Sequence, residues 1–377
     1  MSEREAAPAP VDICGLSLSE LTALCTEAGL APYRSRQLFE WVQRRAGAGW
    51  AEAGNISGAD KARLAEGLSW GLPVPLEERV SADGTRKFLF QLADGETIET
   101  VLLDYRKDRS RSHATLCLSV QVGCALGCPF CATGRAGWRR NLSPGEITGQ
   151  LLAVTARMRR ENASFHVGNL VFMGMGEPFY NMNAFLQAVR ILNDARGQNI
   201  GARRMTVSTA GVVPGILRLA AEAPQIGLAV SLHAGTDELR DVLVPLNRRY
   251  PLARLMEACR EYVLRTGRRI TFEMALTEES ATETQARAVA ALLRGLPAHV
   301  NLIPVNIVAG SAARRPTGAR VAAFRRLLTE RGLAVTIREE RGADIEAACG
   351  QLRQSGAKRK GAEAICHLPS SDKTSQE

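Results

Sequence analysis

The sequence has no apolar run close to the roughly 18 residues that a membrane-spanning helix needs, so we expect no membrane partner. The first residues, Met1 to Glu5, are charged, and no apolar stretch follows them. We therefore expect no secretory signal peptide and a cytoplasmic location. No internal repeat of the solenoid type is visible. Nine cysteines in a chain without an export signal favour thiol or metal chemistry over a disulfide framework.

Acidic residues are fewer than basic ones: 39 Asp and Glu stand against 48 Lys and Arg, which gives a net charge of +9. A basic surface favours a polyanionic partner, and nucleic acid is the first candidate. A basic soluble protein without such a partner has the same composition, so charge alone leaves both interpretations open. With 377 residues, 45% of them hydrophobic, the chain is long enough for one large domain and one smaller domain.

Three cysteines lie close together in the sequence, in the pattern C-x3-C-x2-C formed by Cys124, Cys128 and Cys131. Thiolates are soft ligands that bind zinc or iron–sulfur clusters. A structural zinc ion needs four ligands, so a zinc site would require Cys117 or a histidine to complete it. A cubane 4Fe-4S cluster held by three cysteines would instead leave one iron open for a substrate. The pattern favours the cluster and leaves the zinc site as the alternative.

The chain divides into segments of different periodicity. Helical spacing up to about Leu68 predicts an accessory helical domain over residues 1–78. Residues 79–110 are predicted to form a β-hairpin extension, because strand patterns at 87–92 and 97–103 flank the turn dipeptide Asp94-Gly95. Residues 111–353 are expected to form the main domain. The polar segment 354–377 is expected to be a disordered tail.

From Thr115 onward, predicted strands alternate with predicted helices, which is typical of a parallel sheet covered by helices. The first helix has a clear start: Ser143 is the expected N-cap, Pro144 the first helical residue and Glu146 the capping-box partner. The predicted strands are 115–122, 168–174, 204–209, 227–233, 269–275, 300–305 and 334–338. The predicted helices are 144–160, 181–194, 214–222, 251–266, 281–295 and 317–332. Length alone does not separate a partial barrel from an open doubly wound sheet.

Several polar residues follow predicted strands and would meet at one mouth of this domain. Gly176 and Glu177 follow the second strand, where glycine lets the backbone approach a ligand and a carboxylate can bind an ammonium group. The other such residues are Ser208, Ser231, Leu232, His233 and Asn306. Any one of them alone is more typical of a cap or a turn. Together they fit a cofactor that carries a nucleoside.

A second unusual stretch lies near the C-terminus, where alanine, glycine and glutamine surround Cys349. Small neighbours leave its sulfur accessible, and a thiolate is a good nucleophile. A buried structural cysteine is the default interpretation of an isolated Cys. The segment gains meaning only beside the cysteine triplet.

These segments together resemble the RlmN/Cfr family of radical S-adenosylmethionine RNA methyltransferases, and most of all its RlmN branch. The resemblance extends from about Leu16 to Leu352. It rests on residues 33–41, 98–101, 121–134, 174–178, 231–233 and 347–352. What it implies for the fold is an α/β architecture with a partial (β/α)6 TIM-like barrel, which favours the barrel over the doubly wound sheet.

The resemblance also implies methylation at C2 of an adenosine, with two molecules of S-adenosylmethionine per turnover. By similarity, Cys349 takes a methyl group from the first molecule, and a radical formed from the second activates that methyl group. The resulting S-methylene radical adds to adenine, and Glu99 removes the proton from the attacked carbon. Cys117 then attacks the sulfur of Cys349, which releases the product and leaves a transient disulfide.

The ligands of one 4Fe-4S cluster are implied to be Cys124, Cys128 and Cys131. The contacts to S-adenosylmethionine are implied to be Gly176, Glu177, Ser208, Ser231, Leu232, His233 and Asn306. The implied substrates are an adenosine in the peptidyl-transferase region of 23S rRNA and the adenosine beside the anticodon of certain tRNAs. An unstacked loop nucleotide suits such a buried site. A monomer and an electron donor such as flavodoxin are expected.

The chain departs from the family pattern at two places. An Asn-Asp pair that usually follows the fifth strand is missing from the stretch 272–281, and the loop 105–113 is longer than usual and very basic. Both are expected to affect RNA specificity.

Three alternatives stay open. An adenine-C8 methyltransferase of the same family keeps the same cysteines. A non-catalytic, zinc-bearing RNA-binding protein would not need Cys349. The third is a radical S-adenosylmethionine enzyme acting on a peptide or a small molecule, which the net charge of +9 and the lack of further cluster cysteines disfavour.

Overall fold

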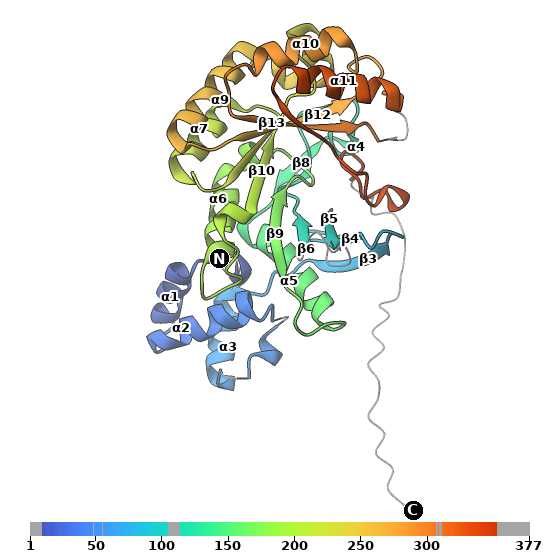
Figure 1. The fold of residues 1–377 in the computed structure, drawn as a ribbon. Coiled ribbons are helices and arrows are strands. Elements are labelled where there is room, and N and C mark those ends of the chain that lie inside the picture. The colour runs from blue at the N-terminus through green and yellow to red at the C-terminus, as the bar shows by residue number, and fades with distance from the viewer. Residues whose placement is uncertain are drawn as a thin grey trace, which may run out of the picture.

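The computed structural model describes residues 10–47, 49–54, 56–104, 114–306, 308 and 311–352. Within these residues the central feature is a curved sheet of ten strands with helices on its outer side (Figure 1). The parallel strands are β6 (Ala114–Cys117), β9 (Val167–Phe172), β10 (Met205–Thr209), β11 (Gly227–Ser231), β12 (Ile270–Leu276), β13 (Ala298–Pro304) and β14 (Ala334–Ile337). The antiparallel strands are β3 (Val74–Val80), β4 (Arg86–Gln91) and β5 (Thr97–Asp104).

The strand order decides between the two expected architectures. Along the sheet it is β14-β13-β12-β11-β10-β9-β6-β5-β4-β3, so each parallel strand lies beside its successor in the chain. A doubly wound sheet reverses direction partway through this order, whereas a barrel winds in one direction. The predicted partial barrel is therefore confirmed.

Six helices alternate with the parallel strands and form the outer layer, each close to its predicted position. They are α5 (Pro144–Arg159), α6 (Met182–Asn193), α7 (Val213–Glu222), α9 (Leu252–Thr266), α10 (Glu283–Leu292) and α11 (Gly318–Glu330). The predicted capping box is present at the start of α5, where Ser143 and Glu146 bond to each other's backbone N–H. Two short helices, α4 (Ala132–Ala136) and α8 (Asp237–Leu243), were not predicted.

The predicted strand 115–122 is wrong in its second half. The ladder of the main sheet ends at Cys117, and residues 121–123 form β7 (Gln121–Gly123), which pairs with β8 (Trp138–Asn141) in a separate hairpin. The break has a side-chain cause. The Gln150 amide of α5 accepts from the Ser119 N–H at 2.9 Å and donates to the Ser119 carbonyl at 2.9 Å. This amide therefore occupies both backbone groups that a neighbouring strand would use.

The antiparallel extension continues the barrel sheet at β6. The predicted hairpin of β4 and β5 is confirmed, but β3 was missed and the predicted boundary at residue 79 lies inside it. Most side chains of β3 are exposed, Val74, Leu76 and Val80 among them, so it lacks the alternation that marks a half-buried strand. The division of the chain into domains stays a prediction.

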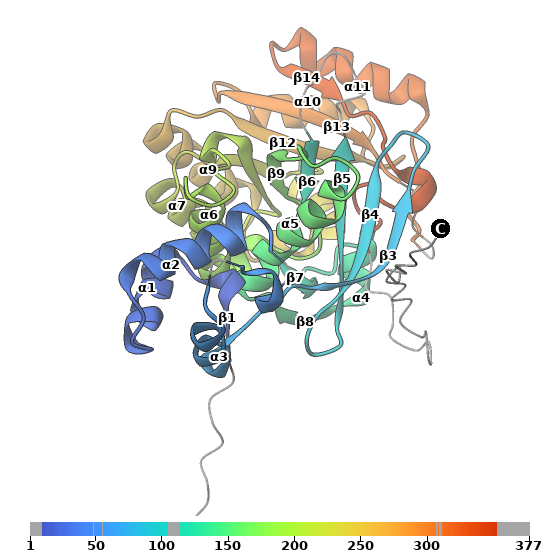
Figure 2. The same ribbon diagram turned by 90° about the horizontal axis from the view of Figure 1, so that it is seen from below.

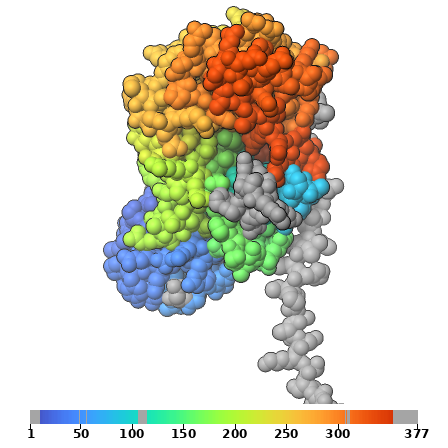
Figure 3. Space-filling model, viewed as in Figure 1, coloured from blue at the N-terminus to red at the C-terminus, as the bar shows by residue number. Residues whose placement is uncertain are grey.

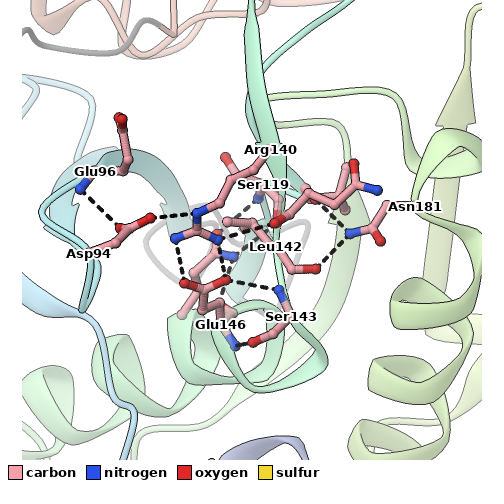
Figure 4. A network of polar contacts seen from close by, with 11 residues as sticks. Asp94, Glu96, Ser119, Arg140, Leu142, Ser143, Glu146 and Asn181 are labelled. Atoms are coloured by element: carbon pink, nitrogen blue, oxygen red, sulfur yellow. Dashed lines mark hydrogen bonds and ion pairs between the residues drawn. The ribbon is translucent and has the colours of Figure 1, made fainter. Parts of the chain in front are cut away.

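Arg140 of β8 joins three elements close to the cysteine loop (Figure 4). Its guanidinium makes two bonds of 2.8 Å to the Glu146 carboxylate at the start of α5, and a third of 2.6 Å to Asp94 in the β4–β5 turn. These carboxylates raise the pKa of Arg140. Nearby, the Asn181 amide donates to the carbonyls of Val120 and Leu142. The network therefore fastens the extension and the β7–β8 hairpin to the barrel.

The N-terminal helices form a smaller lobe, which is blue in Figure 3. This lobe has its own hydrophobic core. The helices are α1 (Leu18–Glu27), α2 (Pro32–Phe39) and α3 (Gly58–Gly67), and the parallel pair β1 (Val11–Asp12) and β2 (Leu68–Ser69) accompanies them. Leu152 of α5 and Ile191 of α6 extend into this core, so the lobe packs on the outer layer of the barrel. No helix in the described part of the chain is long and apolar enough to cross a membrane. The basic loop 105–113 and the tail 354–377 lie outside the described residues.

Candidate active site

The cysteine triplet lies on the loop between β7 and α4, at the carboxyl end of the barrel strands. Cys124 and Cys128 are buried and Cys131 is half-buried. The Cys124 N–H donates to the Gly137 carbonyl at 2.9 Å, and the Cys131 N–H donates to the Cys128 carbonyl at 3.1 Å. These two bonds shape the loop through its backbone and leave the side chains of the triplet free to act as ligands.

All three cysteines line one cavity of about 180 Å³, which brings together most of the predicted cofactor contacts. Those that line it are Gly176, Glu177, Ser208, Ser231, His233 and Asn306. They come from the ends of four strands, β9, β10, β11 and β13, and barrel enzymes place their catalytic groups at such strand ends. Leu232 is the exception among the predicted contacts, because its side chain is fully buried and does not line the cavity.

The arrangement of the sulfur atoms bears on the choice between zinc and a cluster. In a tetrahedral zinc site the thiolates converge on one ion at about 2.3 Å. No three His, Cys, Asp or Glu side chains in the described residues converge in this way. The cysteines are still close enough that Cys131 raises the pKa of both Cys124 and Cys128, although burial contributes more. The three thiols line one cavity, so each of them could bind a different iron of a cluster there.

Glu177 is buried and held by the backbone on both carboxylate oxygens. One oxygen accepts from the Phe179 N–H at 3.1 Å and the other from the Ala210 N–H at 2.8 Å. Burial raises the pKa of Glu177 to about 7, against the lowering effect of these hydrogen bonds. A cationic ligand group in the cavity would favour the ionised carboxylate, as an amino-acid ammonium group does.

Gly176 and His233 shape the cavity wall beside Glu177. Gly176 has a φ of +102°, and a Cβ there would lie 2.5 Å from the Cβ of Gln121, so only glycine fits. His233 also has a positive φ, and its Nδ1 accepts from the Ala275 N–H at 2.9 Å. Burial lowers the pKa of His233 to about 3. The ring is therefore neutral, and with Nδ1 as acceptor its proton is on Nε2.

Arg240 of α8 is a buried residue that sequence reasoning missed. Its guanidinium donates to the carbonyls of Leu232, Ala210 and Ser231 at 2.9, 2.6 and 3.1 Å, and to Oδ1 of Asn247 at 2.8 Å. Burial lowers the pKa of Arg240 to about 10, so it stays charged at neutral pH. The side chain thus ties together the ends of two strands that carry predicted cofactor contacts.

Arg240→Met is expected to lower the free energy of unfolding by about 3 kcal/mol, because it leaves several buried carbonyl groups without a donor. Urea unfolding of the unliganded protein measures this loss. The matched control is Arg218→Met, which removes an exposed ion pair with Glu222 and is expected to leave the midpoint close to that of the unchanged protein. Equal midpoints for the two variants would contradict the structural role of Arg240.

A larger cavity of about 810 Å³ adjoins the first and is lined by both Cys117 and Cys349. Cys349, whose side chain is exposed, lies on a loop that returns to the cysteine triplet. The Asn306 amide donates to the Cys349 carbonyl at 2.9 Å, and the Ala132 N–H donates to the Gly350 carbonyl at 2.7 Å. Cys349 also lines the smaller cavity. The structure therefore places this thiol at the junction of the two cavities.

Cys117 lies on β6, and its thiol is free, as is that of Cys349. Desolvation raises the pKa of Cys117 to about 12; the nearby Cys349 raises it less, and Arg338 lowers it. Cys117 is therefore held as a thiol at neutral pH. Within the described residues no cysteine forms a disulfide, so a Cys117–Cys349 disulfide is not a feature of this structure.

Glu99 lies on β5 and does not line either cavity. Val101 and Leu103, which lie on the same face of that strand, line the larger cavity. Its carboxylate forms an ion pair with Lys87 of β4, with 3.0 Å between Oε1 and Nζ, and both side chains are only 5% exposed. Sequence reasoning missed Lys87. The sequence did contain a signal for Lys87, because a lysine within the apolar strand pattern 87–92 puts a charged side chain on a buried face of the sheet.

Two further cavity residues were also missed. Glu273 of β12 is buried in the smaller cavity, and Arg338 after β14 lines both cavities. The Asn301 amide donates to Glu273 at 2.9 Å, while burial raises the pKa of that carboxyl. The polar residue inside a predicted buried strand was the available signal for Glu273.

The chain is similar to proteins of one family over most of its length. The family model for the radical SAM superfamily matches residues 118–283. A probable dual-specificity RNA methyltransferase RlmN from Desulfitobacterium hafniense is 54% identical, over 91% of this chain and 96% of that protein. The protein of the same name from Heliobacterium modesticaldum is 49% identical, over 91% of this chain and 90% of that protein.

The fold agrees with a solved structure. The crystal structure of a radical SAM methyltransferase from Sphaerobacter thermophilus matches with a TM-score of 0.87 and 46% sequence identity. The match covers 91% of this chain and 99% of the other. The radical SAM family implies a 4Fe-4S cluster and S-adenosylmethionine, and the cysteine loop offers three thiols for such a cluster. The chain therefore belongs to the RlmN family of radical S-adenosylmethionine RNA methyltransferases.

Proposed function

We propose that this enzyme methylates C2 of an adenosine, with Cys349 as the carrier of the methyl group. The observation that carries the proposal is the position of Cys349. Its thiol lies at the junction of the cysteine-triplet cavity and the larger cavity that also holds Cys117. An sp2 carbon of adenine is a poor nucleophile, so a direct methyl transfer to it is hard. A thiol that is open to both cavities can take a methyl group on one side and present it to a base on the other.

In the proposed sequence the Cys349 thiol loses its proton, and its sulfur attacks the methyl carbon of one S-adenosylmethionine, which forms S-methylcysteine and releases S-adenosylhomocysteine. A 4Fe-4S cluster held by Cys124, Cys128 and Cys131 would supply the one-electron chemistry that makes a radical from a second S-adenosylmethionine, and the methyl group on Cys349 would lose one hydrogen atom to that radical. The carbon radical on Cys349 then forms a bond to C2 of adenine. Glu99 accepts the proton from C2, and the one electron left over would return to the bound cluster that supplied it.

Release of the product needs a second thiol. We assign this role to Cys117, which shares the larger cavity with Cys349. Attack of the Cys117 sulfur on the Cys349 sulfur forms an S–S bond and breaks the S–CH2 bond, and a proton completes the methyl group. Burial raises the pKa of Cys117 to about 12 in the free protein, so its thiol has to give up a proton for this attack. The disulfide must be reduced before the next turnover.

Cys124, Cys128 and Cys131 are assigned as the ligands of the cluster in this proposal. The contacts to S-adenosylmethionine are assigned to Gly176, Glu177, Ser208, Ser231, Leu232, His233 and Asn306. Leu232 would take part through its backbone, since its side chain is buried and does not line the cavity.

The proposed substrates are 23S rRNA and tRNA, as the sequence resemblance implies. The name of the relatives, a dual-specificity RNA methyltransferase, supports RNA as the substrate. We further propose that the enzyme acts on these RNAs in the cytoplasm as a monomer and receives electrons from a donor such as flavodoxin. The departure after β12 forms a closed turn in which the Ser280 hydroxyl accepts from the Thr277 N–H at 2.8 Å. This turn is a candidate determinant of RNA preference.

Cys117→Ala is expected to trap a covalent protein–RNA adduct, because no second thiol remains to break the S–CH2 bond. Denaturing gel electrophoresis with labelled RNA detects the adduct as a slowly migrating band. Ribonuclease treatment followed by mass spectrometry should place the remaining nucleotide on Cys349. Free methylated RNA at the normal rate would remove Cys117 from the mechanism.

The position of the methyl group is tested by nucleoside analysis. The reconstituted enzyme is incubated without oxygen with S-adenosylmethionine, a reductant, and either 23S rRNA or tRNA. The digested nucleosides are compared with 2-methyladenosine and 8-methyladenosine standards. The proposal predicts 2-methyladenosine from both RNAs. 8-Methyladenosine would overturn the assigned position but keep the carrier chemistry.

A further inference from the structure

The arm formed by β3 and β4 contacts the loop that carries Cys349. The two segments are distant in sequence but lie side by side, as Figure 2 shows for the cyan arm and the red C-terminal segment. The Asp344 carboxylate accepts from the Ser81 hydroxyl at 2.6 Å and from the Ala82 N–H at 3.2 Å. In return, Asp83 accepts from the Gly342 N–H at 3.0 Å. The turn of the arm therefore holds the start of the Cys349 loop.

Lys87 adds a second contact between the same two segments, this time inside the protein. Its ammonium group forms the ion pair with Glu99 and also donates to the Glu346 carbonyl at 3.1 Å. Glu346 has a positive φ of 55° and lies three residues before Cys349. One buried ammonium group thus contacts the side chain of the proposed base and the backbone of the loop that carries the methyl group.

We propose that Lys87 is a positioning residue that orients Glu99 toward the covalent intermediate and sets the Cys349 loop relative to it. The inference rests on the proposed roles of Glu99 and Cys349. A buried carboxylate needs a partner of opposite charge, and Lys87 is a charged partner at 3.0 Å. The ammonium group has three N–H donors, so it can donate to the Glu346 carbonyl and to the Glu99 carboxylate at the same time. When Glu99 accepts the proton, the bond to the loop keeps Lys87 in place.

The two anchors of the loop predict different defects. Asp344 holds the loop but does not contact Glu99, so Asp344→Ala is expected to slow methylation of Cys349 and leave later steps intact. Lys87 contacts Glu99, which acts only after the protein–RNA bond has formed. Lys87→Gln removes the charge and keeps a hydrogen-bond donor. It is therefore expected to slow breakdown of the adduct.

The experiment measures the ratio of adduct to released 2-methyladenosine in single turnovers of the cluster-loaded enzyme with 23S rRNA. Lys87→Gln is expected to raise this ratio at least about tenfold, as expected when a catalytic group is misplaced. Lys87→Arg should restore it to within about threefold, because the charge and the donors return. Asp344→Ala should leave the ratio unchanged while it lowers the total of both species. Leu76→Ala, which changes an exposed side chain of β3, is the control for the arm.

The outcomes separate this inference from the proposed function. If Glu99→Gln releases product normally, Glu99 is not the base and the role of Lys87 fails with it. If Glu99→Gln traps the adduct but Lys87→Gln does not, only the role of Lys87 is overturned. Circular dichroism establishes that each variant is folded. An unfolded Lys87→Gln beside an active Lys87→Arg would show that the charge is needed for folding, and would overturn the catalytic claim.

Discussion

Replacing Cys349 by alanine is expected to reduce the yield of methylated adenosine by about a thousandfold or more, as is typical when a covalent catalyst is removed. Alanine has no sulfur to receive the methyl group, and adenine C2 has no nucleophilic electron pair for the direct reaction. The geometry gives no substitute, because Cys117, the other cysteine of the larger cavity outside the triplet, is held as a thiol on β6. Liquid chromatography of digested RNA with mass spectrometry measures the yield.

The same variant should keep the chemistry of the smaller cavity. The three cysteines of the triplet remain, so the iron content should equal that of the unchanged protein. Cys25→Ala provides the matched control, since Cys25 is a buried residue in the core of the N-terminal lobe. This control is expected to retain activity. Substantial methylation by Cys349→Ala would show that the methyl group does not pass through this residue.

Replacing Cys128 by alanine is expected to have an effect of similar size at an earlier stage. With two cysteines left in the cavity, one iron of a cubane cluster loses its protein ligand, and we expect the reconstituted protein to hold little iron or sulfide. Formation of 5'-deoxyadenosine should fall by about a thousandfold or more, because that reaction depends wholly on the cluster. Iron and sulfide analysis, the visible absorption spectrum and the 5'-deoxyadenosine assay measure the two effects.

The comparison of the two variants identifies which cysteine serves which step. Cys128→Ala should lose both the cluster and the methylated RNA, whereas Cys349→Ala should lose only the methylated RNA. A protein that loses zinc instead of iron, and remains colourless after reconstitution, would indicate the zinc site that the sequence left as an alternative. Cys259→Ala is a further control, because Cys259 is buried in the barrel core and lines neither cavity.

Features that depend on neighbours in the sequence were predicted well. Ser143, Pro144 and Glu146 located the start of α5 because an N-cap and its partner are three residues apart. The cysteine triplet was likewise recognisable from its spacing. The alternation of strands and helices predicted the barrel class, although only the strand order excluded the doubly wound sheet.

Features that depend on contacts distant in sequence could not be predicted in this way. The break after Cys117 arises from Gln150 of α5, which bonds both backbone groups of Ser119. The role of Lys87 requires the strand β4 to lie beside a loop more than 250 residues later, and 259 residues separate Lys87 from its acceptor Glu346. The small neighbours of Cys349 marked it as an accessible thiol, but its role as methyl carrier came from the family resemblance, because the local sequence says little about where the loop folds back.

The most direct test of the proposed mechanism follows the hydrogen atoms of the methyl group. The enzyme is incubated with 23S rRNA and with S-adenosylmethionine whose methyl group carries three deuterium atoms. The mass of the methylated nucleoside is then measured by mass spectrometry. Transfer through a methylene radical on Cys349 removes one deuterium and later adds a proton, so the product should carry two deuterium atoms. A product that keeps all three would mean direct transfer, and would contradict the role of Cys349 as methyl carrier.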